Sequence, residues 1–344
     1  MESRTAFGRE DSVADARRFQ KVAILGAGAL GLYYGGRLAQ AGCEVHFIVR
    51  SDYARLQESG LVLREGDDVT RIFPVHAHTT PEGAGTVDLV LITLKTVSNG
   101  ELARLLPPLL RERTIVVTLQ NGLGNEDHLA RMIPPDAVYG GLCFIASMRT
   151  APGEVTCLHR GTITFGAYRR PADAKARMIG ELFQRAGIPN RVVDRLDEAR
   201  WRKLVWNIPF NGLGIAAGGV STDIICANAR LSAEVRALMD EVRSAAAALG
   251  FSIPEEFARE QYDVTPPMGA YFPSSVVDFL EKKPVEVESI WGEPLRQALA
   301  AGAAVPRMTM LHALIVQLAA QRQSQADSAV FRISPRTGSS IDSS

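Results

Sequence analysis

Short apolar runs alternate with amphipathic segments along the first half of the chain. The runs are continuously hydrophobic, as expected of strands buried on both faces, and occupy residues 22–25, 45–49, 89–94, 115–119 and 138–145. Helical patterns fall between them, over residues 32–41, 97–110 and 125–132. This alternation predicts a parallel sheet whose strands are joined by right-handed helical crossovers.

Further elements are expected to complete this half of the chain. Turn residues around Gly66 and Asp67 separate two strand-like runs, so they predict an inserted hairpin over residues 61–63 and 69–75. A second hairpin is expected over residues 155–158 and 162–165, followed by a helix over 172–186 and a short strand over 191–194.

From about Leu196 the pattern changes to helical periodicity alone. Helices are predicted over residues 198–217, 229–249, 254–262, 274–282, 294–301 and 308–321. We therefore expect a mixed α/β N-terminal domain followed by an all-helical C-terminal domain. The predicted divisions are an extension over 1–20, an α/β domain over 21–195, a helical domain over 196–322 and a weakly ordered tail over 323–344.

The first apolar run ends in a glycine-rich turn that opens a helical pattern. Gly26 would permit the tight turn, Gly28 would let the backbone approach a phosphate, and Gly31 would let helix and strand pack closely. This order predicts a Rossmann-type dinucleotide site at the helix N-terminus. The residues expected to contact the cofactor there are Gly26, Ala27, Gly28, Ala29, Leu30 and Gly31.

The second apolar run ends in Arg50, where NAD-selective sites place an acidic residue. A cation at this position suits the 2′-phosphate of NADP, so NADP(H) is the expected cofactor. Asp52 follows two residues later and is an alternative ligand for the ribose. A solvated loop arginine is the other interpretation of Arg50.

Polar residues follow two later strands of the predicted sheet. Lys95 comes after the third apolar run, and Asn121 comes after the fourth. Ligands bind at the carboxyl ends of strands in such sheets, so both side chains are candidates for the cofactor site. Lys95 could equally be a solvated lysine, and Asn121-Gly122 could be a turn without another role.

The predicted helical domain begins with a polar stripe. Lys203, Asn207 and Asn211 are spaced i, i+4 and i+8, so they share one helix face. Two asparagines lower helix propensity, which favours a site over a merely exposed face. Pro209 is expected to disturb the helix at this point.

Three later residues are weaker candidates. Ser274 precedes an amphipathic segment and has the properties of a helix N-cap. Glu286 and Glu288 follow the break at Pro284, and either could face solvent.

Composition excludes several classes of protein. The 38 basic and 38 acidic residues give a formal net charge of zero, so neither nucleic acid nor an anionic membrane is an expected partner. The four cysteines form no CxxC pair, so no metal site is expected and a reducing cytoplasm is favoured. No apolar stretch has the length of a membrane span, and no signal-peptide core is present near the N-terminus.

Taken in order, these motifs resemble the ketopantoate reductase (2-dehydropantoate 2-reductase) family from residue 22 to about residue 321. The resemblance implies NADPH-dependent reduction of ketopantoate to pantoate, on the route to pantothenate and coenzyme A. It implies a catalytic role for Lys203, a cofactor-proximal Lys95, and a catalytic and substrate-binding Glu286. The positions that match the family's substrate or nicotinamide side are Asn121, Asn207, Asn211 and Ser274.

Two departures from the family pattern leave open a different 2-oxo acid. Ile-Pro-Phe separates Asn207 from Asn211, and Glu288 competes with Glu286. A protein that binds NADP without turnover is an alternative, although a sensor needs no proton donor such as Lys203. A dehydrogenase of phosphorylated substrates would need an anion clamp, and only Arg200 and Arg202 flank the lysine. The helical domain could also bury an apolar face in a homodimer.

Overall fold

The computed structural model describes residues 19–333, and the chain divides into two compact units at Lys203 and Leu204. We call them the sheet unit and the helical unit. Most of the predicted N-terminal extension lies outside the described residues. The last described helix, α13 (Pro306–Ile333), continues past the predicted domain end at residue 322, and residues 334–344 lie outside the description.

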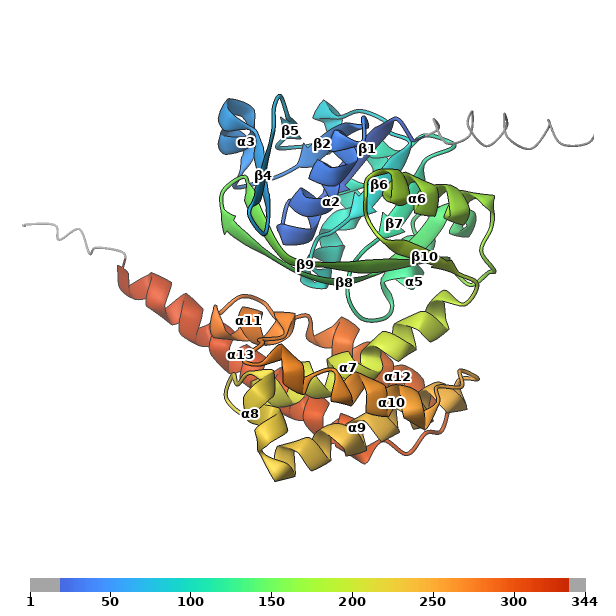
Figure 1. Ribbon diagram of the computed structural model, residues 1–344, viewed down its shortest axis with the longest axis vertical. Helices are drawn as coiled ribbons and strands as arrows, with labels where there is room; N and C mark the ends of the chain where they lie inside the picture. The colour runs from blue at the N-terminus through green and yellow to red at the C-terminus, as the bar shows by residue number, and fades with distance from the viewer. Residues whose placement is uncertain (1–18, 334–344) are drawn as a thin grey trace, which may run out of the picture. The chain divides into compact units, whose positions relative to one another are not determined.

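The sheet unit contains the predicted parallel sheet. Neighbouring strands run in the order β5-β2-β1-β6-β7-β8, and each adjacent pair among them is parallel (Figure 1). After β1 the chain builds β2 and β5 on one side of it, and then returns to build β6, β7 and β8 on the other side. The strand order therefore reverses between β1 and β6. Ligands bind at such a reversal. The strand bounds are β1 Lys21–Leu25, β2 Glu44–Ile48, β5 His76–His78, β6 Leu89–Ile92, β7 Ile115–Thr118 and β8 Val138–Ala151.

Alternating side chains of each strand enter two separate cores. Val22 and Ile24 pack beneath helices α2 (Ala29–Gln40) and α6 (Ala174–Arg185) on one face. Ala23 and Leu25 enter the core on the opposite face, which contains side chains from residues 102–109 and from α5 (Asn125–Ala130). Because both faces are covered, the central strands β1, β6 and β7 are apolar at nearly every position, as the sequence pattern predicts.

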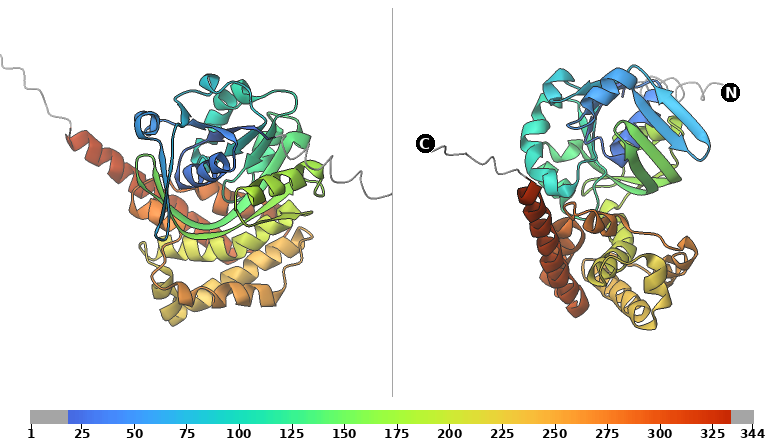
Figure 2. Two further views of the ribbon diagram at one scale, coloured as in Figure 1. Left: turned by 45° about the horizontal axis from the view of Figure 1, so that its top comes forward. Right: turned by 90° about the vertical axis from the view of Figure 1, so that its left-hand side faces the viewer.

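The first predicted hairpin is confirmed, and the second is wrong. β3 (Leu61–Glu65) pairs antiparallel with β4 (Asp68–Ile72). By contrast, residues 154–167 form one strand, β9 (Glu154–Ala167), along the length of β8, and the two make the long curved ribbon in Figure 2. The turn falls at Pro152-Gly153. Gly161 marks a bulge instead, because its φ is +55° and the register with β8 shifts there.

The predicted helix over residues 97–110 is broken into shorter pieces. The structure has a 3₁₀ turn η2 (Thr96–Glu101), a short α4 (Leu102–Leu105) and a 3₁₀ turn η3 (Pro107–Leu109). Pro107 and Pro108 have no N–H to donate to the preceding turn, which ends regular α-helix there. The remaining elements of the unit are α3 (Tyr53–Ser59) and β10 (Asn190–Val193).

The described residues of the helical unit contain helices and turns and no strand. Pro209 lies inside α7 and does not end it. Phe210 is fully buried and stacks on Trp206, with ring centroids 5.0 Å apart. It is therefore a core residue of this unit. The division between the units falls within α7 (Leu196–Ala216), whose residues from Leu204 on belong to the helical unit. The other helices of this unit are α8 Thr222–Ala227, α9 Ala229–Ala248, α10 Glu255–Asp263, α11 Ser274–Leu280, α12 Glu293–Ala300 and α13, with a π-turn at Glu288–Gly292.

Three histidines at the β2–β5 edge predict sensitivity to acid. His46 Nδ1 lies 2.8 Å from His78 Nε2, His46 Nε2 lies 2.7 Å from Glu44 Oε1, and the ring of His76 stacks on that of His46. Burial lowers the pKa of both His46 and His78. As the pH falls, these histidines take up protons in the unfolded chain first, at about pH 6.5. The stability that the folded protein has above this pH is therefore lost progressively as the pH falls toward the lower pKa values of the folded state.

Urea unfolding of the wild type and of His78→Gln, each at about pH 7.5 and about pH 5.5, measures this loss. We expect the free energy of unfolding to fall less in the variant, because glutamine can bond to His46 without titrating. Equal losses in both proteins would show that His78 does not contribute to acid sensitivity.

Candidate functional site

The glycine turn has the local geometry that its sequence predicts. Gly26 adopts a φ of +103°, which favours glycine. A Cβ on Gly31 would lie 2.0 Å from the Gly26 carbonyl oxygen, so helix and turn pack too closely for a side chain. A Cβ on Gly28 would meet nothing within 4 Å, so this residue faces open space. Thr93, just after β6, donates its hydroxyl to the Gly26 carbonyl and fastens the turn.

The start of α2 can receive an anion. Gly28 occupies the N-cap position without a side-chain cap, and no acidic residue lies in the first turn. The N–H groups of Ala29, Leu30 and Gly31 have no preceding helical turn to bond, and the helix dipole adds positive potential there. An open cradle over Gly28 and a positive helix end fit the pyrophosphate of a dinucleotide.

Arg50 and Asp52 occupy different environments. Arg50 is exposed at the end of β2. Asp52 is only 1% exposed, and its carboxylate accepts from the Gly153 N–H at 3.0 Å and pairs with Arg149 at 3.1 Å. Because these contacts engage both carboxylate oxygens, Asp52 holds the turn between β8 and β9 and is a poor alternative to Arg50.

Lys203 and Asn121 are in direct contact within the sheet unit. The Lys203 Nζ atom donates to Asn121 Oδ1 and to the Cys143 carbonyl oxygen, each at 2.9 Å. It also lies 5.3 Å from the centre of the Phe144 ring. Both hydrogen-bonding partners are acceptors, and the ring face attracts a cation, so this environment stabilises the charged ammonium.

The carboxyl ends of neighbouring strands bring several predicted residues to one edge of the sheet. The glycine turn follows β1, Arg50 follows β2 and Asn121 follows β7. Lys95 follows β6, where it is exposed at the N-cap position of η2.

Asn207 and Asn211 are buried in the helical unit and bonded to each other. The Asn211 side chain donates to the Asn207 carbonyl at 3.1 Å, and its Oδ1 accepts from the Ser275 N–H at 3.0 Å. The two side chains are 9% and 2% exposed, so an exposed polar stripe does not describe them.

Ser275, which was not predicted, is more deeply placed than Ser274. Ser274 is exposed and is the first residue of α11, whose N-cap position is Pro273, so the expected N-cap role is wrong. Ser275 is 1% exposed, and its Oγ has no hydrogen-bond partner among the residues that the structure describes. A buried hydroxyl without a partner is a candidate ligand group.

The two glutamates after Pro284 differ in burial. Glu286 is 6% exposed. The Glu288 side chain is 74% exposed and pairs with Arg296 at 3.0 Å. Glu288 is thus a surface residue, and Glu286 is the better candidate for a site.

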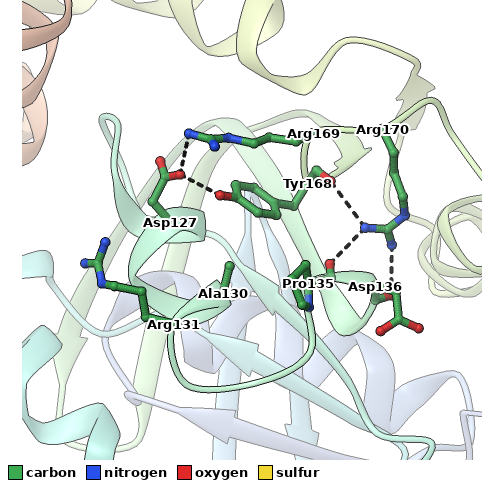
Figure 3. A pocket seen from close by; sticks show the side chains of 8 residues that line it. All are labelled: Asp127, Ala130, Arg131, Pro135, Asp136, Tyr168, Arg169 and Arg170. Carbon is green, nitrogen blue, oxygen red and sulfur yellow. Dashed lines mark hydrogen bonds and ion pairs between the residues drawn. The ribbon is translucent and has the colours of Figure 1, made fainter.

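A separate hollow of about 610 Å³ contains none of the predicted site residues. Asp127 is already engaged within this lining, since Tyr168 donates to it at 2.6 Å and Arg169 pairs with it at 2.8 Å (Figure 3). The lining residues are Asp127, Ala130, Arg131, Pro135, Asp136, Tyr168, Arg169 and Arg170.

Two features are absent from residues 19–333, the part of the chain that the structure describes. No group of three or more His, Cys, Asp or Glu side chains there could hold a metal ion. No helix in that range has the length and hydropathy needed to cross a membrane.

Comparisons with known proteins match both units to one family. The profile described as "Ketopantoate reductase PanE/ApbA" matches residues 22–170, and that described as "Ketopantoate reductase PanE/ApbA C terminal" matches residues 195–319. The chain is 38% identical to a 2-dehydropantoate 2-reductase of Nostoc over 298 residues, which cover 85% of this chain and 93% of the relative.

Solved structures agree. A crystal structure of 2-dehydropantoate 2-reductase from Geobacter metallireducens has a TM-score of 0.84 at 38% identity, covering 86% of this chain and 99% of that one. A D-mandelate dehydrogenase with NADH and anilino(oxo)acetate has a TM-score of 0.80 at 22% identity, covering 88% and 99%, and shows a shared fold. The chain belongs to the ketopantoate reductase family and is a 2-dehydropantoate 2-reductase-like oxidoreductase.

Proposed function

We propose that this protein reduces a 2-oxo acid with NADPH, and that 2-dehydropantoate is its substrate. The observation that carries the proposal is the contact of the Lys203 amine with Asn121 Oδ1 at 2.9 Å, at the strand ends that also present the glycine turn. The 38% identity to a relative named 2-dehydropantoate 2-reductase supports this choice of substrate.

The sheet unit would hold the cofactor through groups of three kinds. The N–H groups at the start of α2 would bind the pyrophosphate, and the open space over Gly28 admits it. Arg50 would pair with the 2′-phosphate. Lys95 and Asn121 are proposed as further contacts. When bound, NADPH would supply the hydride that C2 of the substrate receives.

Lys203 is proposed to act as the general acid. Reduction of the C2 carbonyl places negative charge on its oxygen, and an ammonium both stabilises that charge and donates the proton that completes the hydroxyl. The neutral amine then regains a proton from water. Asn121 Oδ1 and the Cys143 carbonyl accept from the amine, so they orient it and favour its charged form before the reaction.

The buried polar groups of the helical unit are proposed to recognise the substrate. Asn207 and Asn211 offer amide donors and acceptors for a carboxylate and a hydroxyl. Ser275, rather than Ser274, is proposed to contribute a hydroxyl, because its Oγ is buried and has no partner in residues 19–333. Glu286 is proposed to bind the substrate hydroxyl. Phe210 lies in the core of this unit, so it gives no reason to prefer a bulkier acid.

Steady-state oxidation of NADPH tests this proposal, with 2-dehydropantoate beside a panel of other 2-oxo acids and with NADH as the second cofactor. We expect the highest kcat/KM for 2-dehydropantoate with NADPH. A higher value for another 2-oxo acid would reassign the substrate. Tight NADPH binding with no oxidation by any acid would instead favour a non-catalytic sensor.

Arg50→Ala is expected to weaken NADP⁺ binding by roughly 10- to 100-fold, since a charge-assisted hydrogen bond contributes about 1.5–3 kcal/mol. NAD⁺ lacks the 2′-phosphate, so its affinity should change little. Calorimetric titration of both nucleotides measures the difference. Arg104→Ala, which removes an exposed arginine paired with Glu101, is the control. Equal weakening of NADP⁺ and NAD⁺ binding would contradict the assignment of Arg50.

A further inference from the structure

Arg200 makes a buried set of contacts that no sequence pattern indicates. It is 3% exposed and lies one helical turn before Lys203 in α7. Its Nε donates to Glu126 Oε1 at 2.9 Å, and its Nη2 also pairs with this carboxylate. Its Nη1 donates to two backbone carbonyls, those of Gln120 at 3.1 Å and Gly122 at 3.2 Å.

These two carbonyls flank Asn121, the residue whose Oδ1 accepts from Lys203. The Arg200 guanidinium therefore ties the turn that carries Asn121 to the helix that carries Lys203. A planar guanidinium can hold several acceptors in a fixed arrangement, which a lysine amine cannot do. The distance between the Asn121 amide and the Lys203 amine is thus constrained by the direct bond between them and by the bonds of Arg200 to the two flanking carbonyls.

Glu126 and Gly140 complete this arrangement. Glu126 is 5% exposed, lies in the first turn of α5 and provides the counter-charge for the guanidinium. Gly140 on β8 leaves the necessary room, since a Cβ there would lie 2.2 Å from Glu126 Oε1 and 3.0 Å from Arg200 Nη2.

We propose that Arg200, with Glu126 as its buried counter-ion, is a positioning residue that holds Asn121 and Lys203 in their reactive arrangement. This inference rests on the proposed function for its kinetic consequence. The pair does not touch the reacting atoms. It acts by preventing the Gln120–Gly122 turn and the start of α7 from separating, because small displacements of catalytic groups are costly to the rate.

The main test removes both charges together, in Arg200→Met with Glu126→Met. Removing one partner alone would leave an unpaired buried charge and threaten folding, whereas replacing a buried pair by apolar residues is often tolerated. We expect kcat to fall by roughly 10- to 100-fold and the Kd for NADP⁺ to change by less than about twofold. Arg200→Lys keeps a positive charge without the forked geometry, so it should recover only part of the lost kcat.

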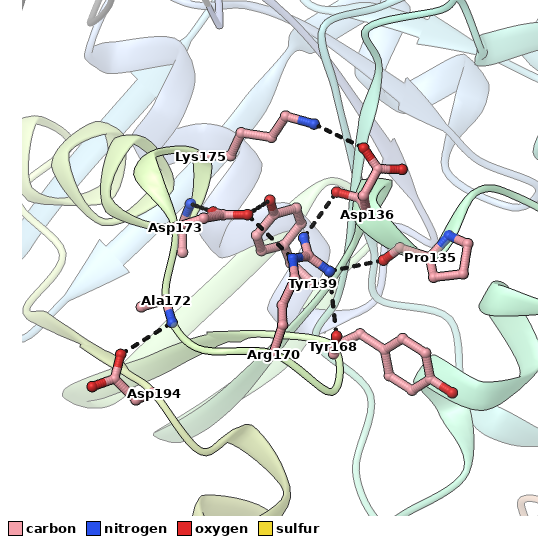
Figure 4. Close-up of polar contacts among 10 residues, drawn as sticks. Pro135, Asp136, Tyr139, Tyr168, Arg170, Ala172, Asp173, Lys175 and Asp194 are labelled. Atoms are coloured by element: carbon pink, nitrogen blue, oxygen red, sulfur yellow. Dashed lines mark hydrogen bonds and ion pairs between the residues drawn. The ribbon is translucent and has the colours of Figure 1, made fainter.

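Arg170 provides a matched control in the same unit. Its guanidinium also bonds to a carboxylate and to backbone carbonyls, namely Asp173 at 3.2 Å, Pro135 at 2.9 Å and Asp136 at 2.8 Å (Figure 4). It ties a turn that carries no proposed site residue. Arg170→Met should lower Tm and leave kcat unchanged. An equal loss of kcat in this variant would show that the effect of Arg200 is general destabilisation.

A second measurement does not depend on turnover. The rate of reductive methylation of Lys203, followed by mass spectrometry, reports how firmly its amine is held. We expect this rate to rise several-fold in the double Met variant and to stay at the wild-type value in Arg170→Met. Wild-type kcat in the double variant would overturn the proposal in an active enzyme. If the wild type reduces no 2-oxo acid, the proposed function fails. The positioning role is then tested by methylation alone, and it is overturned if Lys203 is methylated at the same rate in the double Met variant as in the wild type.

Discussion

Lys203→Met is expected to lower kcat by roughly 10² to 10⁴-fold while the affinity for NADP⁺ changes little, because general acid catalysis contributes about that much to rate. Methionine is similar to lysine in length and removes the charge and the proton donor together. The variant should retain the fold, because an unbranched apolar side chain of similar length fits this half-buried position. Steady-state kinetics with saturating NADPH, together with nucleotide titration, measures both effects.

Lys175→Met is the control for this substitution. Lys175 is a lysine of the same unit whose side chain is 44% exposed and pairs with Asp136 at 3.4 Å. Its removal should change neither kcat nor nucleotide affinity. Near-normal turnover in Lys203→Met would remove this lysine from the mechanism.

Two glycine substitutions in the same turn should separate binding from stability. Gly28 has a φ of −74°, which alanine adopts freely, and its Cβ would meet nothing within 4 Å. Gly28→Ala should therefore fold and place a methyl group in the phosphate cradle, weakening NADP⁺ binding by at least ~10-fold. Gly31→Ala forces a Cβ to 2.0 Å from a backbone oxygen, so it should also lower the free energy of unfolding by roughly 1–3 kcal/mol.

Thermal unfolding and calorimetric titration on the same samples make this comparison. Gly100→Ala is the matched control, since its Cβ also meets nothing within 4 Å and it lies outside the glycine turn. It should leave both quantities unchanged. Wild-type nucleotide affinity in Gly28→Ala would place the pyrophosphate away from this turn.

The parallel sheet could be predicted because its determinants are periodic or local. Val22 and Ile24 face one core while Ala23 and Leu25 face the other, so residues 22–25 of the first strand are all apolar. The glycine turn could also be predicted, because backbone φ and close packing directly restrict which residue types fit there. The same local logic misplaced a turn at Gly161, since a glycine with positive φ also serves a bulge within one long strand.

The parts of the site that escaped prediction depend on long-range contacts. Ser274 and Ser275 are chemically identical neighbours, and the bond from the Ser275 N–H to Asn211, 64 positions away, distinguishes their environments. No local pattern distinguishes Arg200 from the neighbouring arginine Arg202, because its partner Glu126 lies 74 positions away. Glu286 and Glu288 could be separated only by their burial.

The most direct test of the central claim is a single turnover, in which enzyme with stoichiometric NADPH is mixed with 2-dehydropantoate and both NADPH oxidation and pantoate formation are followed. The account predicts that the wild type oxidises the bound NADPH completely with equimolar pantoate, and that Lys203→Met does so at least ~100-fold more slowly. Bound NADPH that stays reduced in the wild type, or equal rates in the two proteins, would contradict it.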